Sequence, residues 1–316
     1  MIRDLGAFVT TALFDREGRA AFALGDGTVA FEGGERTAAH NGAILGACVH
    51  PSGVGVVSGG DDGALVWSRA DAADRVAEVK GRWIDSVDAS ADSGLLAFSA
   101  GREVRVLDVA DPAFERVFQH ERSVADVAFD PRGRRIAAAT YGGAMLWYAR
   151  IADQKPVMLR WAGSHIGLAF SPDGRFLISA MQENALHGWR LSDAKDMRMG
   201  GYPAKIRGLV FFEDGQFLAT SGANGAVVWP FAGANGPMGK QAIEVGFDQS
   251  ALVLRVAAAP KRSLIAAGLD DGRVWVCDFK LQKTETIKAE KGPPISALAM
   301  SPTGRIAWGE MRGFAD

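Results

Sequence analysis

Short apolar segments of strand length alternate with polar turns along the whole chain. One turn recurs, in which an apolar residue is followed by two to four polar or proline residues and then, in most copies, by glycine. Its clear copies begin at Phe14, Val49, Phe129, Phe170, Phe211 and Met300, and weaker copies begin at Ala89 and Ala258. Even spacing of one turn indicates about eight copies of a single structural repeat.

Each repeat is expected to form four antiparallel strands. Apolar runs such as 124–129 and 176–180 flank the recurrent turn, whose Pro, Asp and Gly residues favour a hairpin. A third run follows a second glycine-bearing turn at 63–67, 143–147 and 225–229, and a more polar fourth run, such as 75–79, ends the repeat. Four strands repeated every 35 to 47 residues or so predict an all-β fold, a single closed β-propeller of four-stranded antiparallel blades.

The two ends of the chain bear on the number of blades. The last repeat has a short third strand at 313–316 and lacks a fourth. Residues 2–5 precede the first full repeat and can supply the missing strand, which closure needs because open sheets leave unpaired edges. We therefore expect eight blades, the last completed by the N-terminal strand, in one domain over residues 1–316. Seven blades with an irregular C-terminal extension is the alternative.

The repeats resemble the WD-repeat (WD40) family over nearly the whole chain. That family has a structural tetrad of His before the first strand, Ser in the second, Asp in the next turn and Trp in the third. The second repeat matches all four positions, with His40, Ser58, Asp61 and Trp67, whereas Cys277 replaces the Trp in the seventh repeat. The resemblance implies a rigid scaffold that presents its loops to proteins or peptides.

The family fold also implies that the loops before the first strands share one face with the turns between second and third strands. Blades 3 to 6 bring basic and aromatic residues to that face, namely Arg82, Trp83, Arg102, Arg122, Tyr141, His165, Lys205 and Arg207. Since Trp, Tyr and Arg dominate interface hot spots, we hypothesise that this basic sector binds an acidic or phosphorylated segment of another protein. A scattered, solvated surface is the alternative.

His165 and the acidic turns of this face can also be interpreted as structural. His165 occupies a position that is a β-branched aliphatic residue in the seven other repeats, so it either bonds backbone near the strand entry or contacts a partner. The turns opposite the basic sector are acidic, with Asp26, Asp61, Asp62, Asp270 and Asp271. Asp-Gly is what such turns demand, which favours a structural role for these carboxylates.

Composition adds limits on location and partners. The net charge of −2 provides no global cationic field for nucleic acid or anionic lipid. The only cysteines, Cys48 and Cys277, are too few for a disulfide framework and favour a reducing compartment. Neither a secretory leader nor a run of eighteen apolar residues is present. We therefore expect a cytoplasmic protein that binds neither membrane nor nucleic acid.

Motifs that carry catalysis are absent. The five histidines fall in different repeats, and no His-x-His, His-Glu-x-x-His or Cys-x-x-Cys spacing occurs. Neither a Gly-x-Ser-x-Gly elbow nor a glycine-rich loop followed by a helix is found. The sequence thus predicts no catalytic residue, metal or cofactor, and a non-catalytic protein–protein interaction scaffold. A propeller enzyme or small-ligand binder that uses the central channel is the alternative, and the oligomeric state stays open.

Overall fold

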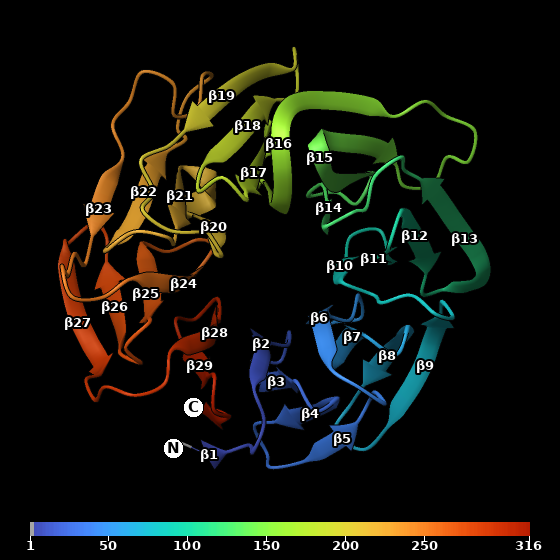
Figure 1. Ribbon diagram of the computed structural model, residues 1–316, viewed down its shortest axis with the longest axis horizontal. Coiled ribbons are helices and arrows are strands. Elements are labelled where there is room, and N and C mark those ends of the chain that lie inside the picture. Colours follow the sequence, from blue (N-terminus) through green and yellow to red (C-terminus); the bar gives the residue numbers. More distant parts are fainter. Residues whose placement is uncertain (1–2) are drawn as a thin grey trace. The chain divides into compact units, whose positions relative to one another are not determined.

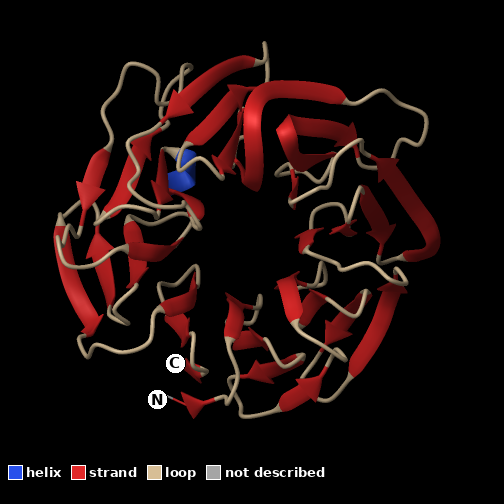
Figure 2. Ribbon diagram, in the orientation of Figure 1, coloured by secondary structure: helices blue, strands red, loops and turns tan. Residues whose placement is uncertain are grey.

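The computed structural model describes residues 3–316, and nearly all of its regular structure is β-strand (Figure 1). Within these residues the one helical element is η1 (Glu213–Gly215), a 3-10 turn (Figure 2). None of the described segments therefore forms a helix that could span a bilayer. The predicted all-β class with antiparallel sheets is confirmed.

The chain divides into two compact units. Unit 1 combines Met1–Ala12 with Ser171–Asp316, and unit 2 is Leu13–Phe170. The boundaries fall within the strand Val9–Phe14 and at the recurrent turn that follows Phe170. The single domain over residues 1–316 stays a prediction.

Four strands follow one another in each of the first three sheets. Their bounds are β2 (Val9–Phe14), β3 (Ala20–Leu24), β4 (Thr28–Phe31) and β5 (Arg36–Ala38); β6 (Ile44–Val49), β7 (Val56–Gly60), β8 (Ala64–Ser68) and β9 (Ala73–Glu78); and β10 (Ser86–Ser90), β11 (Leu95–Ala100), β12 (Glu103–Asp108) and β13 (Asp111–Gln119). The next sheet has six strands, β14 (Asp126–Phe129), β15 (Arg135–Tyr148), β16 (Val157–Phe170), β17 (Phe176–Met181), β18 (Leu186–Arg190) and β19 (Lys195–Met199).

Three further four-stranded sheets lie in unit 1. They contain β20 (Leu209–Phe212), β21 (Phe217–Thr220), β22 (Ala226–Pro230) and β23 (Ile243–Val245); β24 (Val253–Ala258), β25 (Leu264–Leu269), β26 (Val274–Asp278) and β27 (Lys283–Lys288); and β28 (Ile295–Met300), β29 (Ile306–Glu310), β30 (Phe314–Ala315) and β1 (Arg3–Asp4).

The number of blades differs from the prediction. Hydrogen bonding assigns the strands to seven sheets rather than eight, because two predicted repeats fall in the sheet β14–β19. In that sheet β15 runs on through an irregularity between Tyr141 and Gly143, so it contains a predicted second and third strand. The 14 residues of β16 join a predicted fourth strand to the first strand of the next repeat. A count of eight separate blades is therefore wrong.

The N-terminal strand pairs with the C-terminal one. Arg3 and Asp4 of β1 lie opposite Ala315 and Phe314 of β30 in antiparallel register. The backbone N–H of Leu5 also donates to the carbonyl of Gly313 at 2.7 Å. The predicted strand began at Ile2, which lies outside the described residues. The C-terminal residues are thus regular strand rather than the irregular extension of the alternative.

The recurrent turn has one hydrogen-bonded geometry in five copies. In each copy a glycine N–H donates to the carbonyl three residues earlier, at 2.7–3.0 Å, and the glycine has a positive φ. These glycines are Gly18, Gly53, Gly133, Gly174 and Gly304. Positive φ is cheap only for glycine, which explains the residue's regular return. The copy after Phe211 departs from this pattern, since Glu213 and Asp214 themselves have positive φ within η1.

Burial varies across each sheet from one strand to the next. Second strands such as β11 and β17 are buried at every position, whereas fourth strands such as β9 and β27 are almost wholly exposed. The apolar core follows this gradient. One cluster in unit 2 contains Phe118, Val124 and Trp147, and another in unit 1 contains Val253, Trp275 and Cys277. The polar fourth strands therefore carry exposed surface, as their sequence predicts.

Candidate functional site

The second repeat forms a hydrogen-bonded chain around His40. Its Nε2 lies 2.8 Å from Ser58 Oγ, and its Nδ1 lies 3.0 Å from Asp62 Oδ1. The carboxylate is therefore that of Asp62, not of the predicted Asp61. Although burial acts to raise it, hydrogen bonds from the Asn41 N–H and from His40 hold the pKa of Asp62 below its usual value. This network ties the loop before β6 to β7 and to the turn after it.

Trp67, the fourth predicted member, has other partners. Its Nε1 donates to the Val54 carbonyl at 2.9 Å, and its ring stacks on His50 with centroids 4.0 Å apart. The Arg69 guanidinium lies 4.1 Å from the indole centroid. Trp67 therefore holds the recurrent turn of its own repeat in place. It does not join the hydrogen-bond network of His40 and Ser58.

Five residues of the predicted basic sector are exposed in unit 2: Arg82, Trp83, Arg102 and Arg122 lie on loops, and Tyr141 lies within β15. We call them the basic strip. Hydrogen bonds connect their loops: Arg82 Nη1 donates to the Ala100 carbonyl at 3.4 Å, and the His120 N–H donates to the Arg102 carbonyl at 2.9 Å. Trp83 and Tyr141 are each 62% exposed. Unit 2 thus presents both aromatic rings and three guanidinium groups to solvent.

The three arginines of the basic strip differ in how far their charge is neutralised. Arg82 forms a 2.8 Å ion pair with Glu103, which also binds Arg105. Among residues 3–316, neither Arg102 nor Arg122 has a carboxylate within ion-pair distance. The electrostatic attraction of the strip for an anion therefore comes mainly from Arg102 and Arg122.

His165 is not part of the exposed surface. Its side chain is fully buried, and Nε2 bonds to the Trp161 carbonyl at 3.1 Å within β16. An imidazole in this position satisfies backbone and cannot reach a partner. The prediction that His165 contacts a partner is corrected accordingly.

The remaining predicted residues, Lys205 and Arg207, lie in unit 1. Lys205 Nζ donates to Gln182 Oε1 at 2.7 Å, and Arg207 is exposed with its backbone N–H bonded to Ser221 Oγ. Arg207 has an unexpected neighbour in Arg255 of β24. Burial and then the positive charge of Arg207 lower the pKa of Arg255 to about 10. Neither guanidinium has a carboxylate partner in the described part of the chain.

Arg255 was not among the predicted site residues, although the repeats contain a signal for it. It occupies the position two residues after the aligned aliphatic residue of the first strand. The other repeats have at that position Thr11, Gly46, Ser86, Asp126, Gly167, Gly208 and Ala297. A long cation among mostly small residues is an outlier, and such outliers on an inner strand point to a specific electrostatic role.

The acidic turns serve mainly to fix their own geometry. Asp26 binds Arg36 and accepts from Thr28, and Asp271 binds Arg273 at 2.8 Å. Asp270 Oδ1 accepts the Leu252 N–H at 2.9 Å. These contacts agree with the structural interpretation of the turn carboxylates.

Two further carboxylates on inner strands have strongly shifted pKa values. Burial raises the pKa of Asp88 to about 7 and that of Asp126 to about 6. Asp88 Oδ2 accepts the Phe129 N–H at 2.7 Å, and Asp126 accepts the Ser86 hydroxyl at 2.6 Å. Both therefore link the strands β10 and β14. These bonds describe structural carboxylates.

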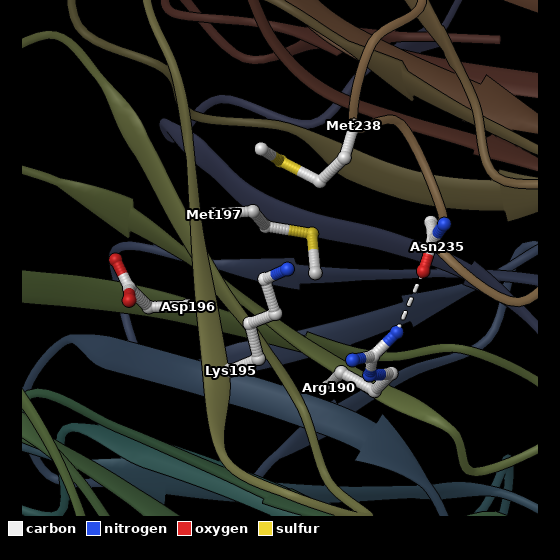
Figure 3. A pocket seen from close by; sticks show the side chains of 6 residues that line it. All are labelled: Arg190, Lys195, Asp196, Met197, Asn235 and Met238. Atoms are coloured by element: carbon white, nitrogen blue, oxygen red, sulfur yellow. Dashed lines mark hydrogen bonds between the residues drawn. The ribbon is translucent and has the colours of Figure 1, made fainter.

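A small cavity of about 90 Å³ lies beside β18 and β19 in unit 1 (Figure 3). Arg190 points across it to Asn235, which accepts from Nη1 at 2.7 Å, while Met197 and Met238 line the other side. Arg190 also binds Asp193 at 2.6 Å. The cavity is too small for a drug-sized ligand, so its contacts serve to hold the 231–242 loop against β18.

Comparison with known proteins finds one matching family model and two partial relatives. A family model described as "WD domain, G-beta repeat" matches residues 35–68. Pre-mRNA-processing factor 19 homolog 2 of Arabidopsis thaliana is 23% identical over 59% of this chain and 33% of its own length. Protein LST8 homolog of Drosophila melanogaster is 28% identical over 44% of this chain and 49% of its own length. The chain thus matches a third to about half of the length of these relatives.

Solved structures extend the likeness to the whole chain. The computationally designed Ika8 protein has a TM-score of 0.79 at 15% identity, covering 99% of this chain and 96% of that one. A chain of a mitotic checkpoint complex has a TM-score of 0.66 at 15% identity, covering 100% and 93%. At these identities the likeness concerns the fold alone. The repeats, the His40 network and the family match at 35–68 agree with this likeness, so the chain is similar to WD-repeat (WD40) β-propellers.

Proposed function

We propose that this protein is a non-catalytic interaction scaffold that binds an acidic or phosphorylated segment of a partner protein. The observation that carries the proposal is the pairing of exposed aromatic rings with guanidinium groups that lack carboxylate partners within residues 3–316. In unit 2 these are Trp83, Tyr141, Arg102 and Arg122. Such residue types supply hot-spot energy and charge-assisted bonds to carboxylate or phosphate.

Unit 1 offers a second basic group of the same character. Burial is the main cause that lowers the pKa of Arg255, and the positive charge of Arg207 lowers it further, so the two cations repel one another. An anion bound between two such cations would relieve that repulsion and accept hydrogen bonds from both. A phosphate or carboxylate is therefore the partner chemistry that this group favours.

The relatives support a scaffold in general terms. One is named as a pre-mRNA-processing factor, and one structural neighbour is part of a checkpoint complex, which is an assembly of proteins. We extend this to a cytoplasmic location and to binding without catalysis, on the basis of the expectations drawn from the sequence. The alternative of a channel enzyme stays a prediction that no described contact favours.

A binding assay with matched charge reversals tests the proposal. The first variant carries Arg102→Glu, Arg122→Glu and Arg207→Glu; the control carries Arg75→Glu, Arg198→Glu and Lys283→Glu on exposed outer strands. Both change the net charge by the same amount. Arrays of acidic peptides with and without phosphoserine are probed with each protein at low and high salt.

We expect wild type and control to retain the same peptides while the first variant loses at least about tenfold in affinity, equivalent to ~1.4 kcal/mol. Binding should weaken as salt screens the charges. Equal loss in both variants would mean that only net charge matters. No loss in the first variant would reject the proposed surface.

A further inference from the structure

Cys277 occupies a position that is tryptophan in several other repeats. Trp67, Trp147 and Trp229 stand at the same place near the end of the third strand. A residue on the facing sheet also differs between the two units. Phe118 of β13 lies opposite Val104, and the corresponding residue of β23, opposite Ala226, is Val245. Two large rings in one pair of sheets are thus replaced by a thiol and an isopropyl group in another pair.

In unit 2 the two rings fill the groove between neighbouring sheets. Phe118 and Trp147 are stacked with centroids 4.7 Å apart and planes inclined by 11°. Both are buried, and Trp147 Nε1 donates to His120 Nε2 at 3.1 Å. This stack shows what the groove accommodates when its residues are large, namely a flat aromatic ring with an N–H group at its edge.

In unit 1 the corresponding groove, between β23 and β26–β27, is a pocket of about 260 Å³. Ile243, Val245, Cys277 and Phe279 supply its apolar lining, and Glu244, Gln282 and Thr284 add polar groups. The nearby indole of Trp275 does not fill it, because that ring is buried in the core against Gly246. Its volume exceeds the ~150 Å³ of an enclosed apolar cavity that suffices to bind benzene, but this pocket is open to solvent on one side.

We propose that this pocket binds a flat aromatic ring of about indole size, in the place that Trp147 fills in unit 2. The apolar wall would bury the ring faces, while Gln282 or Thr284 can accept a hydrogen bond from a ring N–H. The ring belongs either to a free aromatic compound or to a side chain of a bound peptide. The site is independent of the basic strip and of the partner proposed above.

Ligand titrations followed by NMR on the full chain test this proposal. The probes are indole, N-acetyl-tryptophanamide and, as a non-aromatic compound of similar bulk, cyclohexanol. We expect indole to bind saturably with a Kd of about 1 mM or tighter, and cyclohexanol at least about tenfold more weakly. If N-acetyl-tryptophanamide binds as well as indole, the site suits a peptide side chain; if only indole binds, it suits a free compound.

Substitutions assign the binding to the pocket. Cys277→Trp should fill the space and weaken indole binding at least tenfold, whereas the near-isosteric Cys277→Ser should leave it within about threefold. Val245→Phe fills the pocket from the opposite wall and replaces Cys277→Trp should that variant not fold. Absence of saturable binding, equal affinity for cyclohexanol, or unchanged affinity in the filled variants would overturn the proposal.

Discussion

The hydroxyl of Tyr202 lies 2.7 Å from that of Thr220, in the relation that His40 Nε2 has to Ser58 Oγ at 2.8 Å. Tyr202 also accepts from Trp229 Nε1 at 2.7 Å, so that three side chains of one repeat are joined. Two repeats thus connect their first loop to their second strand with different residues. Both repeats have a hydrogen bond between a side chain of the first loop and a side chain of the second strand. The residue types that form this bond differ between the two repeats.

Loss of that hydroxyl should destabilise the protein. Tyr202→Phe would leave Thr220 and Trp229 without their common partner at a buried place, which costs about 1–3 kcal/mol of the free energy of unfolding. Urea denaturation measures this change. Tyr148→Phe is the control, because Tyr148 is 54% exposed, and it should shift the free energy by less than about 0.5 kcal/mol. Equal effects of the two changes would contradict a structural role for the Tyr202 hydroxyl.

Asp88 should give stability an unusual dependence on pH. Burial raises its folded-state pKa to about 7 from an ordinary value of 3.8. Between these values the folded state binds more protons than the unfolded state, so the free energy of unfolding falls as pH rises from about 4 to about 7. Asp88→Asn removes this titration, and its carboxamide oxygen can still accept the Phe129 N–H.

Urea denaturation of wild type and Asp88→Asn at several pH values measures the effect of Asp88. We expect the variant to gain stability relative to wild type over that range, on the order of 2 kcal/mol once partial exposure to water is allowed for. Asp92→Asn, at an exposed turn residue, should run parallel to wild type. A constant difference between wild type and Asp88→Asn across the range would show that Asp88 is already ionised at pH 4.

Removal of the Arg207 charge should stabilise the protein slightly. Burial and then the charge of Arg207 lower the pKa of Arg255, and the second of these causes is a repulsion between the two guanidinium groups. Arg207→Gln should therefore raise the free energy of unfolding by about 0.5 kcal/mol at low salt, and the gain should shrink at 1 M salt. Arg207→Lys retains the charge and should show no such gain. A loss of stability in Arg207→Gln would mean that Arg207 makes a favourable contact instead.

Both thiols should resist modification in the folded protein. Burial and then the charge of Asp88 raise the pKa of Cys48 well above its usual value, and burial raises that of Cys277. The thiolate is the reactive form, so reaction with an aromatic disulfide reagent at pH 8 should be far slower than in denaturant. Cys48→Ser and Cys277→Ser assign the two rates. Fast reaction of either thiol in the native protein would show that its strand opens readily.

Local interactions explain why so much of the fold could be predicted from the sequence. The turns at Asp130–Gly133 and Ser171–Gly174 need glycine at a positive φ, and the buried strands that follow them need runs of apolar residues, so both leave regular marks in the chain. The class, the strands and the pairing of the N-terminal residues with β30 followed from these marks. His40 and Ser58 were predicted as partners because the resemblance to the WD-repeat family assigns both residues to fixed positions of the repeat.

Only the tertiary structure decided which side chains meet. Asp62 rather than Asp61 reaches His40, His165 turns inward, and Arg255 lies beside Arg207, because one residue of register changes the side of a strand or turn on which a group lies. The seven-sheet count depends on β16 continuing unbroken through two predicted strands. The pocket at Cys277 likewise depends on Val245 of another sheet, and contacts between sheets leave no periodic mark in the sequence.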